Sequence, residues 1–194
     1  FDDDISNLLI NRAKEVLISS GSIERPIVFG NNDTPGVMLS SAAKEYLKVY
    51  GVLVGRNPLI FTNNDSGYET AIEFKKNGVD PVILDTRKNT KSEIVNESID
   101  LGINIKFSYV VVAAQGYNKV KSADIAKISV DKEQLGTVEN IKCDCICVSG
   151  FWTPTIHLAS QSGNKTKFKE DIDAFVPGKS KQNETTLGAA NGIY

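Results

Sequence analysis

Residues 58–85 read PLIFTNNDSGYETAIEFKKNGVDPVILD, which places two short apolar runs on either side of an amphipathic segment. The runs at 58–61 and 81–85 have the length and the flanking residues of buried strands. Residues 65–77 have the spacing of a helix with one apolar face. A strand, a helix and a second strand in this order predict a βαβ unit with a right-handed connection and a parallel sheet.

The signals at the ends of these segments support this interpretation. Asp65 is a residue type that caps helices, and Asn77-Gly78 can end the same helix. Thr90-Lys91-Ser92-Glu93 has the pattern of a capping box and predicts a second helix that ends near Gly102. Residues 103–106 then predict a third strand.

Upstream, residues 14–21 have a polar start, an apolar centre and a small-residue end, which predicts the end of a parallel strand at Ser20-Gly21. Thr34-Pro35-Gly36 supplies a helix N-cap and a proline for the first turn. We therefore expect a helix over residues 37–50 that stops at Gly51.

The alternation of strands and helices stops at Tyr109. Strand-like segments follow at 109–114, 117–128, 138–142 and 144–148, with a turn at Gln115-Gly116. They predict a β-meander that returns to the parallel sheet. Residues 163–184 are polar and loop-like, and residues 188–194 look like the start of a helix, so we expect the chain to be truncated there.

The loop after the first strand of the βαβ unit departs from the pattern that binds dinucleotides. That pattern needs Gly-x-Gly-x-x-Gly, because side chains would keep a pyrophosphate away from the helix N-terminus. Here Thr62 and Asn64 stand in the first two glycine positions, and only Gly67 meets the third, which lets the helix pack on the strand. We expect this loop to keep its fold and to have lost phosphate binding, with Asp65 repelling phosphate charge.

Three other features are candidate functional residues. Asp85, at a strand end, can hold a ribose hydroxyl or can be a solvated carboxylate. His157, the only histidine, has no activating motif nearby and is interpreted as a structural hydrogen-bonding residue rather than a catalyst. Cys143, Cys145 and Cys147 alternate, so in a strand they share a face; we interpret them as small core residues rather than metal ligands or disulfide partners. No residue is nominated as catalytic or metal-binding.

Charge and hydropathy exclude some partners. The chain has 22 Lys and Arg against 24 Asp and Glu, with no block of like charge, which argues against nucleic acid and membrane surfaces. No apolar run has the length of a membrane span, and residues 1–4 are acidic where a signal peptide is basic. We expect a cytoplasmic protein.

Several strings resemble the alpha subunits of heterotetrameric sarcosine oxidases. They are 24–29 and 31–38 (ERPIVF and NNDTPGVM), 61–66 (FTNNDS), 143–144, 148–158 (VSGFWTPTIHL), 160–163, 175–178 and 188–192 (GAANG). The resemblance covers effectively the whole chain. It implies an internal fragment of a longer polypeptide, with other regions before and after it.

The resemblance also implies the fold. The family is similar to disulfide reductases, whose α/β, Rossmann-type, three-layer FAD/NAD(P)-binding fold has a β-meander and a second dinucleotide-type domain inserted into the first. We accordingly assign residues 1–55 to the first dinucleotide-binding domain and its linker, 56–150 to the inserted domain, and 151–194 to the return into the first.

By the same resemblance, Ser20 and Gly21 correspond to a strand end that meets the bound dinucleotide. The returning segment lies beside them, which makes the further candidate cofactor contacts Gly188, Ala189, Ala190, Asn191 and Gly192. Ser20 replaces a commoner threonine and keeps its hydroxyl.

For the intact complex, the resemblance implies beta, gamma and delta partner subunits, with NAD, FAD and FMN as cofactors, the flavins mostly on a partner, and tetrahydrofolate used by a missing C-terminal region. The implied reaction is the oxidative demethylation of sarcosine. Two alternatives remain: a related enzyme acting on opines, proline or glycine, and a non-catalytic assembly module, which the altered glycine loop favours.

Overall fold

The computed structural model describes residues 10–129 and 135–194, so the acidic start at residues 1–4 lies outside it. The described chain divides into two compact units. Of the described residues, unit 1 contains 10–23 and Thr153–Tyr194, and unit 2 contains those of Glu24–Trp152. The two units divide the chain at residues 23/24 and 152/153, whereas the domains assigned from the sequence divide it at 55/56 and 150/151. Whether the units are the two dinucleotide-type domains of a longer protein stays a prediction.

Unit 2 is built on a five-stranded parallel sheet in the order β3-β10-β4-β5-β6. Its strands are β3 (Val37–Leu39), β10 (Cys145–Ser149), β4 (Pro58–Thr62), β5 (Val82–Asp85) and β6 (Asn104–Phe107). The predicted parallel sheet, and the return of the chain to it after the meander, are confirmed. The return strand β10 lies between β3 and β4.

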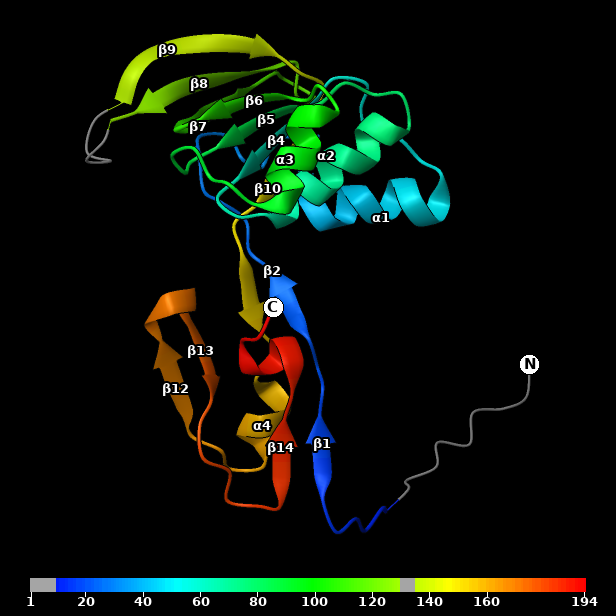
Figure 1. The fold of residues 1–194 in the computed structure, drawn as a ribbon, viewed down its shortest axis with the longest axis vertical. Helices are drawn as coiled ribbons and strands as arrows, with labels where there is room; N and C mark the ends of the chain where they lie inside the picture. The colour runs from blue at the N-terminus through cyan, green and yellow to red at the C-terminus, as the bar shows by residue number, and fades with distance from the viewer. Residues whose placement is uncertain (1–9, 130–134) are drawn as a thin grey trace. The chain divides into compact units, whose positions relative to one another are not determined.

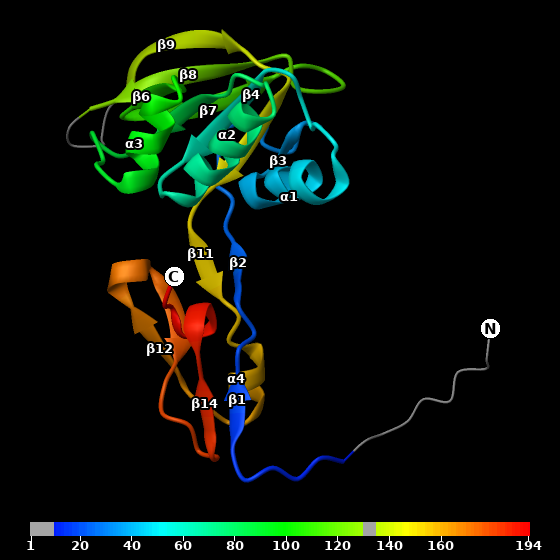
Figure 2. The ribbon, with the colours of Figure 1, turned by 45° about the vertical axis from the view of Figure 1, so that its right-hand side comes forward.

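Three helices cover one face of this sheet, and an antiparallel meander covers the other (Figures 1 and 2). The helices are α1 (Ser40–Tyr50), α2 (Ser66–Lys76) and α3 (Glu93–Asp100). The meander strands are β7 (Tyr109–Gln115), β8 (Ser122–Ile128) and β9 (Leu135–Lys142), in that spatial order. The result is the expected three-layer α/β architecture.

Alternation along the central strands explains the two faces. Ile60 in β4 packs with the helices, while its neighbours Leu59 and Phe61 pack with the meander. Because β4 is buried on both faces, it reads as a continuous apolar run rather than an alternating one. The expected apolar face of α2 is confirmed, since Tyr68 and Ala71 are fully buried in the helical layer.

Unit 1 is smaller. The strands β1 (Val16–Ile18) and β14 (Glu184–Thr186) form a parallel pair, and β12 (Thr166–Lys169) and β13 (Ala174–Pro177) form an antiparallel pair. One short helix, α4 (His157–Gln161), and two 3-10 turns, η1 (Glu170–Ile172) and η2 (Gly188–Asn191), complete the unit. The strands β2 (Ser22–Glu24) and β11 (Trp152–Pro154), in which the unit boundaries fall, pair with each other.

Several expectations about local structure were wrong. Residues 37–39 form β3 instead of the first turn of a helix, so α1 begins at Ser40, although it ends at Gly51 as expected. The helix α3 begins at Glu93, so the capping box at residues 90–93 does not form and Ser92 is the N-cap. The tail at 163–184 contains the β12-β13 pair, in which Phe168 and Phe175 make an edge-on ring contact.

A further correction concerns the cysteines. Cys145 and Cys147 lie in β10 and share the helical face, but Cys143 precedes the strand and packs with the meander. All three thiols are free and buried, as expected of core residues. Burial raises the pKa of Cys143 to about 12, and a hydrogen bond with Cys145 together with burial raises the pKa of Cys147.

The thiols should therefore be unreactive in the folded protein. Only the thiolate reacts readily, and both raised pKa values keep these groups protonated at pH 8. We expect an aromatic disulfide reagent to modify almost no thiol in the native protein at pH 8, and all three after denaturation in guanidinium. Rapid native reaction of one or more thiols would contradict the buried placement.

Gly67 provides a test of the contact between α2 and β4. A Cβ at this position would lie 2.6 Å from the Cβ of Thr62, so Gly67→Ala must push the helix off the strand. Overpacking of this kind costs about 1–3 kcal/mol of unfolding free energy. The control Glu69→Ala, on the exposed side of the same helix, removes only an exposed ion pair with Lys44 and should change that free energy by less than about 1 kcal/mol. Chemical denaturation measures both; equal effects would refute the contact.

Candidate functional site

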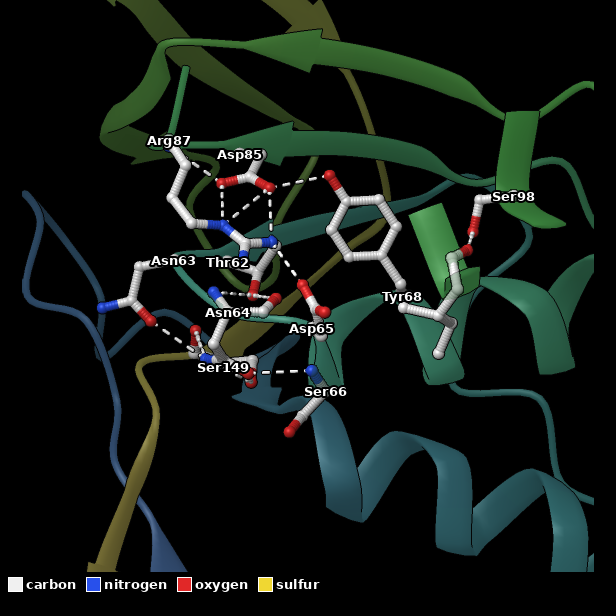
Figure 3. Close-up of polar contacts among 11 residues, drawn as sticks. Thr62, Asn63, Asn64, Asp65, Ser66, Tyr68, Asp85, Arg87, Ser98 and Ser149 are labelled. Carbon is white, nitrogen blue, oxygen red and sulfur yellow. Dashed lines mark hydrogen bonds and ion pairs between the residues drawn. The ribbon is translucent and has the colours of Figure 1, made fainter. Parts of the chain in front are cut away.

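The carboxyl ends of parallel strands are the usual ligand-binding edge of an α/β sheet. In unit 2 this edge contains the loop from Thr62 to Ser66, which joins β4 to α2 (Figure 3). The Thr62 hydroxyl accepts a hydrogen bond from the Asn64 backbone N–H at 3.1 Å and donates one to the Asn64 carbonyl at 2.8 Å. Thr62 is fully buried, so its side chain closes the turn from inside.

Asn64 ties this loop to its surroundings. Its Oδ1 accepts a hydrogen bond from the Ser66 backbone N–H at 2.8 Å, at the start of α2, and its Nδ2 donates to the Ser149 carbonyl at 3.0 Å, at the end of β10. Asp65 is the N-cap residue of α2, as expected, but its side chain makes no capping hydrogen bond, and the Ser66 N–H donates to Asn64 instead. The Asp65 carboxylate pairs with Arg87 instead, at 2.8 Å.

The next strand end contains a buried ion pair. Asp85, at the end of β5, is 0% exposed, and its Oδ2 accepts hydrogen bonds from the Tyr68 hydroxyl at 2.7 Å and from Arg87 Nη2 at 2.8 Å. Its Oδ1 accepts the Arg87 backbone N–H at 2.8 Å and Arg87 Nε at 3.1 Å. We call Asp65, Tyr68, Asp85 and Arg87 the strand-end cluster.

Within the strand-end cluster, Arg87 and Tyr68 compensate the buried charge of Asp85. Burial and the hydrogen bond to Asp85 raise the pKa of Tyr68, which keeps its hydroxyl protonated and donating. Burial lowers the pKa of Arg87, but hydrogen bonds and charge attraction from Asp85 and Asp65 outweigh it and raise that pKa, so the guanidinium stays charged. Such compensation is what makes a buried carboxylate tolerable in a folded protein.

This arrangement does not fit a dinucleotide. Asp85 is not the solvated carboxylate of one sequence interpretation, and both of its oxygens already accept hydrogen bonds, which leaves the ribose interpretation without a free acceptor. The loop that would receive a pyrophosphate contains the side chains of Thr62 and Asn64. Sequence reasoning missed Tyr68 and Arg87 as partners of Asp85, although Arg87 lies only two positions after it.

The hydroxyl of Tyr68 can be tested by removal. Tyr68→Phe leaves the buried Asp85 carboxylate without one charge-assisted donor, which costs about 1.5–3 kcal/mol of unfolding free energy. Tyr109→Phe is the matched control, because the Tyr109 hydroxyl makes an exposed 3.5 Å contact with Glu139. The control should cost less than about 0.5 kcal/mol. Similar denaturation midpoints for the two variants would argue against the hydrogen bond.

In unit 1, strand pairing brings three of the sequence-predicted contact residues to one edge. β1 and β14 are parallel, with Ile18 opposite Thr186, and the ladder continues through a hydrogen bond from the Leu187 N–H to the Ile18 carbonyl at 2.9 Å. Ser20-Gly21 and Gly188 therefore follow adjacent strand ends. The Ser20 hydroxyl donates to the Thr155 carbonyl at 2.7 Å, which leaves its oxygen able to accept.

The glycines at this edge differ in the space around them. Gly21 and Gly188 have φ values of 72° and 59°, and a Cβ on either would meet no atom within 4 Å. Gly192 is different, because a Cβ there would lie 2.6 Å from Ile172 Cδ1. Gly21 and Gly188 therefore have open space beside the backbone, whereas Gly192 is a packing position.

The other predicted contacts lie on the turn η2. Ala190 is buried in unit 1, Ala189 is half-buried, and the carbonyl of Ala189 accepts a hydrogen bond from the Gly192 N–H at 3.1 Å. Asn191 lines a polar hollow of about 200 Å³ together with Asn164 and Glu184. A hydrogen bond from the Ser162 hydroxyl lowers the pKa of Glu184, which keeps this rim anionic. His157, at the start of α4, is exposed.

The chain is similar in sequence to three named proteins. It is 34% identical over 185 residues to the sarcosine oxidase subunit alpha of Corynebacterium sp. strain P-1, 32% identical over 183 residues to that of strain U-96, and 36% identical over 186 residues to that of Rhizobium meliloti strain 1021. These matches cover 92–94% of this chain and 17–19% of the relatives, so the chain spans about a fifth of their length. No family model matches.

Solved structures share the fold. The match with thioredoxin reductase from T. acidophilum covers 93% of this chain and 58% of the reductase chain, with a TM-score of 0.71 and 16% identity. The match with L-proline dehydrogenase from P. horikoshii covers 92% of this chain and 30% of the dehydrogenase chain, with a TM-score of 0.59 and 22% identity. The chain thus has the Rossmann-type FAD/NAD(P)-binding fold of the thioredoxin-reductase kind, as the sequence predicted. In the described part of the chain, no helix is both long and apolar enough to cross a membrane.

Proposed function

We propose a function from homology: this chain is homologous to a segment of the sarcosine oxidase alpha subunits, and it forms part of a flavin-dependent complex that oxidatively demethylates sarcosine. The observation that carries this proposal is 32–36% identity over nearly the whole chain to three proteins of that name. In the proposed reaction, sarcosine, oxygen and water give glycine, hydrogen peroxide and formaldehyde; with tetrahydrofolate the one-carbon product is 5,10-methylenetetrahydrofolate.

Within this complex, we assign the chain a scaffolding role rather than a catalytic one. Unit 1 would hold one side of an NAD site, because Ser20, Gly21 and Gly188 lie at adjacent strand ends and both glycines leave open space. NAD, when bound, supplies a nicotinamide that can accept hydride. The residues of unit 1 would position the NAD molecule. Ser20 would accept a hydrogen bond from it, and the two glycines would let it approach the backbone.

The proposed complex includes beta, gamma and delta subunits, with FAD and FMN mostly bound by a partner subunit and folate by a region outside this segment. A second candidate is a module that supports assembly without binding a nucleotide. The filled loop of unit 2 favours it for that unit. The two roles are compatible within one complex, because a scaffold domain can serve an enzyme without taking part in the chemistry.

The activity is tested by oxygen uptake. The full-length chain, co-expressed with its neighbouring subunits, should consume oxygen with sarcosine in preference to proline, glycine and opines, and tetrahydrofolate should change the one-carbon product. Turnover with one of the other amines alone would refute the assignment to sarcosine while leaving the fold unaffected.

The NAD site is tested by substitution at the open glycines. In the full-length complex, Gly21→Ala and Gly188→Ala place a methyl group in the ligand space and should weaken NAD binding by about tenfold or more, since a small misfit at a close backbone approach costs at least about 1.4 kcal/mol. Gly51→Ala is the matched control: it has a φ of 65° and equally open surroundings, but it lies in unit 2. Calorimetric titration with NAD measures all three; equal affinities would remove the site from unit 1.

A further inference from the structure

In unit 2, side chains of the protein itself fill the edge of the sheet at which this kind of fold ordinarily binds its ligand. The strand ends of β4, β5 and β10 meet at one edge of the sheet, where an α/β fold ordinarily receives its ligand. Asn64 crosses from the end of β4 to Ser149 at the end of β10, and Arg87 crosses from the end of β5 to Asp65 at the start of α2 (Figure 3). Every strand end at this position is therefore bonded to a neighbour.

We propose that Thr62, Asn64 and the Asp65–Arg87–Asp85 ion pairs form a lock that excludes dinucleotides from unit 2, so that this chain offers a dinucleotide site in unit 1 only. The exclusion of dinucleotides from unit 2 is independent of the proposed function. The statement that unit 1 holds a dinucleotide rests on the proposed function.

The first reason is steric. A pyrophosphate at a helix N-terminus needs bare backbone N–H groups and glycines that let it approach. Here the Ser66 N–H already donates to Asn64 Oδ1, and Asn64 is 95% buried. Thr62 is fully buried beneath the loop and contacts the helix at Gly67, so it has no room to move aside.

The second reason is electrostatic. The lock contains two carboxylates and one guanidinium, a net charge of −1, beside the helix end that would attract phosphate. Arg87 cannot turn outward to bind phosphate without leaving Asp85 buried, with only the Tyr68 hydroxyl and the backbone N–H of residue 87 as partners. A buried carboxylate without its cation destabilises the folded state strongly, so Arg87 stays paired with Asp85.

The test is amide hydrogen exchange in the full-length protein with its partner subunits, with and without millimolar NAD or NADP. In the wild type, exchange over residues 62–68 should not change when either nucleotide is added. In the opened variant Thr62→Gly/Asn64→Gly/Asp65→Ala, we expect nucleotide to slow exchange there at least fivefold. Glu69→Ala, a change in the same helix outside the lock, should behave as the wild type.

Each outcome decides the proposal. Nucleotide protection of residues 62–68 in the wild type would overturn it. A folded opened variant that gains no protection would show that the exclusion has another source, and would overturn it as well. If circular dichroism shows that the triple variant is unfolded, the double variant Asn64→Gly/Asp65→Ala, which keeps Thr62 as the support of the turn, takes its place. Protection at residues 20–21 and 188–192 reports separately on unit 1, so its absence refutes the proposed NAD site and leaves the result for unit 2 intact.

Discussion

The burial of the Asp85 carboxylate is the constraint on which the ligand-binding edge of unit 2 depends. A fully buried charge must have a partner of opposite charge and enough hydrogen bonds to satisfy its oxygens. Arg87 and Tyr68 supply both, and Arg87 reaches on to Asp65. One charge thereby connects the end of β5, the start of α2 and the loop between β4 and α2.

The three-layer core explains why this loop can differ from a dinucleotide-binding loop without loss of the fold. The sheet is held by alternating apolar residues, such as Ile60 toward the helices and Phe61 toward the meander, and none of these contacts involves the loop. Gly67 is the one glycine of the binding pattern that α2 needs for packing, because Thr62 lies directly beneath it. The glycine that serves packing is present, and the two that serve phosphate are replaced.

The regular parts of the fold could be predicted from the sequence because their signals are local. Apolar runs predicted β4, β5 and β6 nearly as observed. Gly51 and Asn77-Gly78 predicted the ends of α1 and α2. The failures involve competition between neighbours. Residues 37–39 satisfy a helix pattern but pair with β10, and Asp65 stands at the N-cap of α2 but its carboxylate forms an ion pair instead of a capping hydrogen bond. Partners distant in sequence decide both cases.

The candidate site was predicted in the same uneven way. Ser20 and Gly188 were placed at one edge by resemblance, and parallel pairing of β1 with β14 brings them there. The state of Asp85 could not be read from the sequence, since the same residue at a strand end is a ribose ligand when free and a structural anchor when Arg87 folds back onto it.

The two units thus use strand-end residues in opposite ways. In unit 1, Gly21 and Gly188 leave open space beside the backbone. In unit 2, longer side chains satisfy one another, so the edge is complete without a ligand. In our proposal, this division leaves only the strand edge of unit 1 open to a dinucleotide, while the side chains of unit 2 close the edge of its sheet.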